Sequence, residues 1–201
     1  MSRWEPNTRE RLLDAALDLF GERGYDSVTV AEIAERAGLT KRTFFRHFTD
    51  KREVLFAGQE ALSRIFADAI TALPASASPI EAVAAALEAA AAPFGPQRRE
   101  RAKQVQAVVA DHSDLREREL LKHATLTAAM ASALRERGVP DPAASLAAEI
   151  GGLAFTTGFT RWIEPGNERE FAELTREALA ELVAATATLT TTILRGQQPN
   201  D

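Results

Sequence analysis

Residues 29–52 read TVAEIAERAGLTKRTFFRHFTDKR, and this stretch decides the fold. Thr29 followed by Glu32 is a capping box that starts a helix, and Gly38 ends that helix. Thr40 then caps a second, short helix. Two helices joined by a turn of about three residues that contains glycine predict a helix-turn-helix.

The short helix after Thr40 has one apolar and one cationic face. At 100° per residue, Phe48 lies about 40° from Phe44, whereas Arg42 and Arg46 lie about 160° and 200° from it. An exposed arginine pair alone is usually a solvated surface. In a helix-turn-helix, however, a guanidinium can meet O6 and N7 of guanine together, which discriminates a base by about 1–3 kcal/mol. The combination predicts that this helix reads DNA.

Further side chains on and after this helix suit a nucleic-acid surface. Thr43 and His47 flank the two arginines and can bond phosphates or bases, and Lys41 and Phe45 occupy the opposite shoulder. Lys51 begins the next helix, where an ammonium and exposed amides can jointly hold a phosphate. We expect that contact to fix register rather than to read sequence.

The charge distribution agrees with a cationic surface on an acidic protein. The net charge of −5 belongs to residues 54–201, because residues 1–53 carry equal numbers of acidic and basic side chains. Residues 40–52 carry a net charge of +4. Counterion release depends on charges near the phosphates and not on the total, so an overall negative charge does not exclude DNA as a partner.

The composition is that of a folded globular protein. The chain has 201 residues, of which 45% are hydrophobic and 26% charged, and it contains no cysteine. Disulfides and thiolate metal sites are therefore excluded, and a reducing cytoplasm is the expected setting. The charged N-terminus lacks the apolar segment of a secretory signal. The longest uncharged stretches fall short of the roughly 20 residues that cross a membrane.

Apolar residues recur at helical spacing between glycine and proline stop signals, and the alternation typical of strands is missing. The sequence therefore predicts an all-α fold of about nine helices. Their expected ranges are 7–23, 29–37, 40–47, 50–73, 78–93, 96–112, 113–137, 142–163 and 168–195.

The stretch from residue 12 to residue 56, LLDAALDLFGERGYDSVTVAEIAERAGLTKRTFFRHFTDKREVLF, resembles the DNA-binding domain of the TetR family of bacterial regulators. The resemblance covers about the first quarter of the chain. It implies a three-helix DNA-binding domain, a fourth linking helix, and a larger helical domain that binds an inducer and dimerises through its last two helices.

The resemblance also assigns roles to single residues. Thr29, His47 and Lys51 match phosphate contacts of the family. The contact-bearing start of the recognition helix matches Thr40, Lys41, Arg42 and Thr43. Phe45 departs from the family pattern, which usually has tyrosine there; the phenolic contact to phosphate is lost, and Phe45 can offer an apolar surface to a thymine methyl group.

These observations predict a DNA-binding domain over residues 1–50 and a ligand-binding and dimerisation domain over residues 51–201. The expected function is that of a repressor that leaves a palindromic operator when a small apolar or amphipathic effector binds. An alternative is a helix-turn-helix regulator controlled by a protein partner. An enzyme is not expected, because the sequence has no phosphate-binding glycine loop, nucleophile elbow or metal motif, and no cofactor is implied.

The larger domain carries no motif, so its effector site is predicted from apolar residues on the fourth to eighth helices. Such stripes are usually core, yet several phenylalanines fall where these helices converge, and a cavity there would be mostly apolar. The predicted lining residues are Phe66, Ile70, Phe94, Val109, His123, Met130, Phe159 and Trp162. His112 and His123 are too few to predict a metal site.

Three glycines inside the penultimate helix invite a packing explanation, because glycine weakens a helix interior by about 1 kcal/mol relative to alanine. Gly151, Gly152 and Gly158 allow close helix approach, either within one chain or between two. A long apolar face on the last helix suits a four-helix dimer interface. That face consists of Leu174, Leu179, Leu182, Thr186, Leu189 and Ile193.

Overall fold

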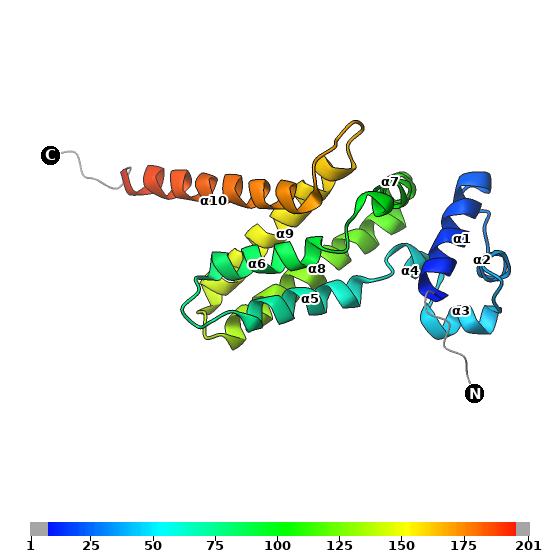
Figure 1. Cartoon of the computed structure of the whole chain (residues 1–201), viewed down its shortest axis with the longest axis horizontal. Helices are drawn as coiled ribbons and strands as arrows, with labels where there is room; N and C mark the ends of the chain where they lie inside the picture. The colour runs from blue at the N-terminus through cyan, green and yellow to red at the C-terminus, as the bar shows by residue number, and fades with distance from the viewer. Residues whose placement is uncertain (1–7, 196–201) are drawn as a thin grey trace. The chain divides into compact units, whose positions relative to one another are not determined.

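The computed structural model describes residues 8–195, with side chains up to Leu189, and in this part of the chain it contains ten α-helices and no strand. The predicted all-α fold is confirmed. The helices form two units (Figure 1). Within the described part of the chain, the N-terminal unit holds residues 8–59 and Arg101–Lys122, and the C-terminal unit holds Glu60–Glu100 and residues 123–195. The predicted boundary between a DNA-binding domain and a ligand-binding domain after residue 50 remains a prediction.

The first helices of the N-terminal unit are α1 (Thr8–Arg23), α2 (Val30–Arg36), α3 (Lys41–His47) and α4 (Lys51–Leu55). Helix α1 packs against α2 and α4, and α2 packs against α3. Gly24 ends α1 with a φ of 80°, a left-handed conformation that glycine adopts without a steric cost. The predicted helix-turn-helix is therefore present as α2 and α3.

The prediction of a single long helix over residues 50–73 is wrong. The structure has α4 followed by a separate helix α5 (Gln59–Ala72), which is why the described residues contain ten helices instead of nine. Gly58 lies between them with a φ of 100°, which breaks the helical path. The apolar pattern did not reveal the break, because Val54, Leu55 and Phe56 before it and Leu62 after it are all buried.

The N-terminal unit is completed by the later part of α7 (Pro96–Asp111) and the first part of α8 (Ser113–Glu136). The predicted break at residues 112 and 113 is confirmed. Val109 and Leu115 are buried in the same hydrophobic core as Leu12, Phe20 and Ile33. Two ion pairs add polar contacts at its edge, and they join Arg101 to Asp14 and Arg118 to Glu53.

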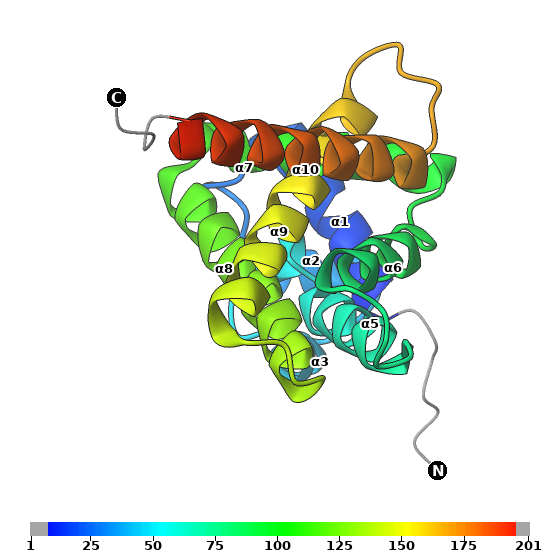
Figure 2. The same ribbon diagram turned by 90° about the vertical axis from the view of Figure 1, so that its left-hand side faces the viewer.

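The C-terminal unit contains α5, α6 (Pro79–Ala91), α9 (Asp141–Ile163), α10 (Phe171–Arg195) and the remaining parts of α7 and α8. Helix α6 begins with the predicted capping box of Ser78 and Glu81. Helix α10 packs along α9 and also contacts α6, and α6 contacts α9 (Figures 1 and 2). The last two helices are thus packed together within one chain.

The three glycines of α9 are explained by packing inside the C-terminal unit. A Cβ atom added to Gly151 would lie 2.6 Å from Val83 and 3.3 Å from Met130, and one added to Gly152 would lie 2.6 Å from the Thr127 hydroxyl. Of the two interpretations that the sequence left open for these glycines, packing within one chain accounts for their positions.

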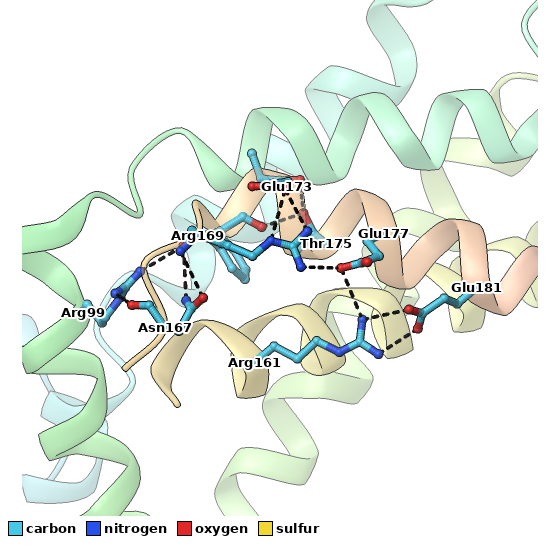
Figure 3. A network of polar contacts seen from close by, with 10 residues as sticks. Arg99, Arg161, Asn167, Arg169, Glu173, Thr175, Glu177 and Glu181 are labelled. Carbon is cyan, nitrogen blue, oxygen red and sulfur yellow. Dashed lines mark hydrogen bonds and ion pairs between the residues drawn. The ribbon is translucent and has the colours of Figure 1, made fainter. Parts of the chain in front are cut away.

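A polar network orders the connection between α9 and α10 (Figure 3). The Arg99 guanidinium donates to the carbonyl oxygens of Asn167 and Arg169, and its Cζ atom lies 5.5 Å from the centre of the Trp162 ring. The Arg169 side chain in turn bonds Glu173 at 2.8 Å and the Glu177 carboxylate at 2.9 Å. These bonds tie the start of α7 to the start of α10.

A second arginine joins the C-terminal ends of two helices in the C-terminal unit. Arg137, directly after α8, donates to the carbonyl oxygens of Ile70 at 2.8 Å, Leu73 at 2.7 Å, Pro74 at 2.8 Å and Ala77 at 3.2 Å. The last carbonyls of a helix have no partner within the helix, so this guanidinium satisfies the end of α5.

None of the helices in the described part of the chain is both long and apolar enough to cross a membrane.

Candidate nucleic-acid interface

Helix α3 begins where two threonine hydroxyls lie side by side. The Thr40 hydroxyl oxygen accepts a hydrogen bond from the Thr43 backbone amide at 3.1 Å, and the two hydroxyl oxygens are 3.0 Å apart. This is the N-cap predicted from the sequence, and it satisfies one of the amides that a helix leaves unpaired. Both hydroxyls stand at the start of the exposed side of α3.

The two faces of α3 are those expected from the helical wheel. Phe44 and Phe48 are buried, and their rings lie 5.5 Å apart in the core of the N-terminal unit. Arg42 and Arg46 are exposed on the opposite side. Phe45 remains 49% exposed although it is a large apolar side chain. We call the exposed residues Thr40, Lys41, Arg42, Phe45 and Arg46, together with half-buried Thr43, the α3 face.

Arg42 and Arg46 of the α3 face differ from other arginines of the N-terminal unit in their ion pairing. Elsewhere in the N-terminal unit Arg23 pairs with Glu32 at 2.8 Å and Arg36 with Glu22 at 2.8 Å. Among the residues that the structure describes, neither Arg42 nor Arg46 has an ion-pair partner. Their charge is therefore available to an external anion.

An aromatic ring lies among these cations. The Lys41 ammonium is 5.8 Å from the centre of the Phe45 ring, and the Phe45 ring packs edge-on against buried Phe44 at 5.6 Å. A cation over a ring face is attracted by its quadrupole. The ring is thus held at the surface by contacts on both sides and offers an apolar patch within the cationic α3 face.

His47, predicted to bond phosphates or bases, lies at the edge of the buried side of α3. Its ring is half-buried, and its Nε2 atom is buried without a hydrogen-bond partner among the described residues. Burial lowers the pKa of His47, and the nearby charges of Arg46 and Arg9 lower it further. Both effects favour the neutral imidazole over the charged one.

Thr29 caps α2 through the predicted capping box. Its backbone amide and its hydroxyl both donate to the Glu32 carboxylate, at 2.8 Å and 2.7 Å, and the Glu32 amide donates back to the hydroxyl at 3.4 Å. The bonds from Thr29, followed by the bond from Arg23, lower the pKa of Glu32 to about 2. Thr29 is exposed beside this carboxylate.

Two side chains fix this unit through contacts that the sequence did not predict. Arg11 of α1 donates to the Ala37 carbonyl oxygen at 2.6 Å and so holds the turn between α2 and α3. Lys51, expected to point at phosphate, donates to carbonyl oxygens of the segment between α1 and α2. All of these carbonyl groups are more than 20 positions away along the chain from the side chain that binds them, so no local pattern signals the contacts.

The predicted effector residues are only partly brought together. The rings of Phe94 and Trp162 lie 5.6 Å apart, those of Phe94 and Phe159 lie 6.4 Å apart, and Phe155 bridges Phe94 to Phe66. Phe171 also contacts Phe94, Phe159 and Trp162; it was not predicted, because the expected site was limited to the fourth to eighth helices and Phe171 lies on the last one. We call these six residues the aromatic cluster.

The other predicted effector residues lie elsewhere. Ile70 and Met130 are fully buried in the C-terminal unit, whereas Val109 belongs to the core of the N-terminal unit. His123 lines an open groove of about 410 Å³ between α8 and α9. The Thr156 hydroxyl lies 3.1 Å from its Nδ1 atom. The remaining lining residues are Thr127, Glu149, Ile150, Gly152 and Leu153.

Comparison with known proteins identifies the part of the chain that forms this surface. Residues 12–57 match the family model for bacterial regulatory proteins of the tetR family. Residues 12–57 form a TetR-family domain. The resemblance noted in the sequence is thereby confirmed. Among curated TetR-family relatives, TcmR of Streptomyces glaucescens, an HTH-type transcriptional regulator, is 40% identical over 82 residues. That match spans 41% of this chain but only 36% of TcmR.

Solved structures extend the likeness along the chain. A TetR-family transcriptional regulator from Mesorhizobium loti is 27% identical with a TM-score of 0.54, and the match covers 90% of this chain and 95% of that one. SmeT of Stenotrophomonas maltophilia, in its complex with triclosan, is 24% identical with a TM-score of 0.56, covering 90% of this chain and 91% of SmeT. The SmeT likeness shows a common fold.

Proposed function

We propose that the protein is a DNA-binding transcriptional regulator that holds its operator through the α3 face. The observation that carries this proposal is the unpaired charge of Arg42 and Arg46 on a short helix whose other side is anchored by Phe44 and Phe48. Rigid anchoring matters, because a base is recognised only when the donor is held in one orientation.

The side chains of the α3 face have distinct proposed roles. Arg42 and Arg46 read base edges, and Phe45 contacts a thymine methyl group. Lys41, Thr40 and Thr43 bond phosphates or bases at the start of the helix, and Thr29 bonds a phosphate beside them. His47 acts as a neutral hydrogen-bond partner only. Phosphate contacts fix the register, so affinity and sequence preference come from different residues.

The proposed functional form is a homodimer built on α9 and α10. Helix α9 leaves an apolar stripe uncovered, in which Leu146 is 58% and Leu153 is 53% exposed, with Ile150 between them. On α10, Leu189 is 66% exposed. Large exposed apolar side chains at helical spacing suit a helix-helix interface. Two-fold symmetry then places two α3 helices on a near-palindromic site.

We further propose that a small apolar or amphipathic effector releases the operator, as a repressor requires. SmeT, which shares the fold, is itself a repressor of a multidrug efflux pump and forms a complex with triclosan. The proposed site in this chain is the aromatic cluster, whose rings an effector would have to separate. The chain passes between the two units within α7 and α8 and at the start of α5, so a shift in the C-terminal unit can reach α3.

Selection of bound duplexes from random DNA tests the central part of this proposal. The expected result is enrichment of a near-palindrome whose half-sites lie about 34–36 Å apart along the duplex, one helical turn. Analytical ultracentrifugation of the selected complex should show two chains per site or a multiple of two. Failure to enrich any sequence, with the protein folded, would overturn the proposal.

A further inference from the structure

The side chain of Lys51, the first residue of α4, bonds to backbone carbonyl groups of its own chain. Its ammonium donates to the carbonyl oxygens of Tyr25 at 2.8 Å, Asp26 at 3.3 Å and Val28 at 3.3 Å. It also lies 4.1 Å from the centre of the Tyr25 ring. An ammonium has three N–H donors, so these three carbonyls can take all of them.

The segment that supplies the carbonyls is itself firmly held. Tyr25 and Val28 are buried in the core of the N-terminal unit. The Ser27 hydroxyl donates back to the carbonyl oxygens of Arg23 at 2.5 Å and Gly24 at 3.2 Å. Three carbonyl oxygens that converge on one point repel each other unless a cation lies between them, and hydrogen bonds from a charged donor are stronger than neutral ones. Lys51 supplies that cation.

One of these bonds acts on the peptide unit at which α2 begins. The Val28 carbonyl and the Thr29 amide belong to the same planar peptide, so fixing one group orients the other. Lys51 holds the carbonyl side of this plane, while the Thr29 amide donates to Glu32 at 2.8 Å on the other side. The Thr29 hydroxyl donates to the same carboxylate, so the orientation of this peptide also influences where the hydroxyl points.

We propose that Lys51 is a positioning residue of the DNA-binding surface, which acts through the Val28–Thr29 peptide to aim Thr29 and does not itself contact phosphate. This role rests on the proposed function, because Thr29 matters only if the surface binds DNA. It also gives α4 a direct connection to α2: a displacement of the first residue of α4 moves the peptide that caps α2.

The first test examines the bonds in the protein without DNA. In ¹⁵N NMR spectra of lysine ammonium groups, Lys51 should give a slowly exchanging signal, whereas exposed Lys41 should exchange too rapidly to be observed. Lys51→Arg keeps a cation with several donors and so should keep the fold while it removes the signal, which assigns it. A Lys51 ammonium that exchanges as rapidly as that of Lys41 would overturn the proposal.

The second test separates positioning from phosphate contact in operator binding. Lys51→Met should lower affinity roughly fivefold, the scale of one misplaced N-cap. The slope of log affinity against log salt should stay unchanged. Lys41→Met, which removes a lysine of the α3 face, is the matched control and should reduce the slope by about 0.9. Thermal melting of each variant verifies that it is folded at the assay temperature.

A double-mutant cycle supplies the readout that a merely stabilising role would not give. If Lys51 acts through Thr29, Lys51→Met should have much less effect on affinity in a Thr29→Val background than in the wild type. Additive effects together with a slope reduced by about 0.9 would show that Lys51 contacts phosphate and would overturn the proposal. Absence of DNA binding by the wild type would instead overturn the proposed function and this role with it.

Discussion

Gly158 of α9 lies so close to Thr175 of α10 that a Cβ atom on the glycine would be 2.9 Å from the backbone nitrogen and Cα of the threonine. Thr175 is buried, and its hydroxyl donates to the Phe171 carbonyl oxygen at 3.1 Å, so it has little freedom to move away. The contact sets the distance between the last two helices.

Replacing Gly158 by alanine should therefore destabilise the protein. We expect Gly158→Ala to lower the free energy of unfolding by about 1–3 kcal/mol, because the added methyl group meets backbone and not a flexible side chain. Urea unfolding at fixed protein concentration measures it. The control is Gly21→Ala in α1, where a Cβ meets nothing within 4 Å and a gain of about 0.5–1 kcal/mol is expected. Equal gains in both variants would contradict this packing.

The capping box of α2 should make stability depend on pH in the acid range. The pKa of Glu32 is lowered from 4.5 to about 2 by its bonds to Thr29 and Arg23. A depressed folded-state pKa gives stability that is complete above the unfolded pKa and is lost as pH falls from about 4.5 toward 2. Glu32→Gln should remove this part of the pH dependence of the unfolding midpoint. Glu35→Gln, on the same helix but outside the capping box, should retain it, and identical profiles for the two variants would exclude this cause.

The proposed dimer interface predicts a specific effect of charge. Leu153→Glu places a carboxylate in the exposed stripe of α9 and should shift sedimentation at micromolar concentration from dimer toward monomer, because a buried unpaired charge is costly. Leu120→Glu is the matched control, since Leu120 of α8 is 71% exposed but lies outside the stripe. If Leu120→Glu dissociated the dimer and Leu153→Glu did not, the interface would have to be placed elsewhere.

Effector release predicts a reciprocal effect. A compound that weakens operator binding by a coupling of about 1–3 kcal/mol must itself bind roughly 5–150-fold more weakly when the operator is present. Calorimetric titration of a candidate apolar effector, with and without the selected duplex, measures this factor. Phe94→Ala, which removes the ring at the centre of the aromatic cluster, should change the effector affinity and leave operator affinity unaltered. Equal effector affinities in the two titrations would exclude this mechanism for that compound.

Most of the helix-turn-helix could be predicted because its signals are local. Capping boxes, the glycine stops and the apolar period of α3 all act within a few residues, and the structure confirms the cap at Thr40 and the burial of Phe44. The break between α4 and α5 was not predicted, because its local signal is weak. A glycine is tolerated within a helical pattern, so Gly58 by itself did not indicate the end of a helix.

The remaining site features depend on contacts between distant parts of the chain. The carbonyl oxygens that bind the Lys51 ammonium, and the burial that lowers the pKa of His47, follow from tertiary packing. The predicted effector set mixed residues of two units for the same reason: the helical period indicates that Val109 and Met130 are buried, but it does not show in which core.

The exposed arginines of α3 are proposed to read DNA bases, and selection of bound sequences by arginine variants is the most direct test of this role. Arg42→Ala and Arg46→Ala should each relax the preference at one position of every half-site, at a cost of about 1–3 kcal/mol for the preferred sequence. Arg64→Ala, which removes an exposed arginine of α5, should leave the preference unchanged. If both α3 variants selected the same sequence as the wild type with the same affinity, the proposed reading surface would be wrong.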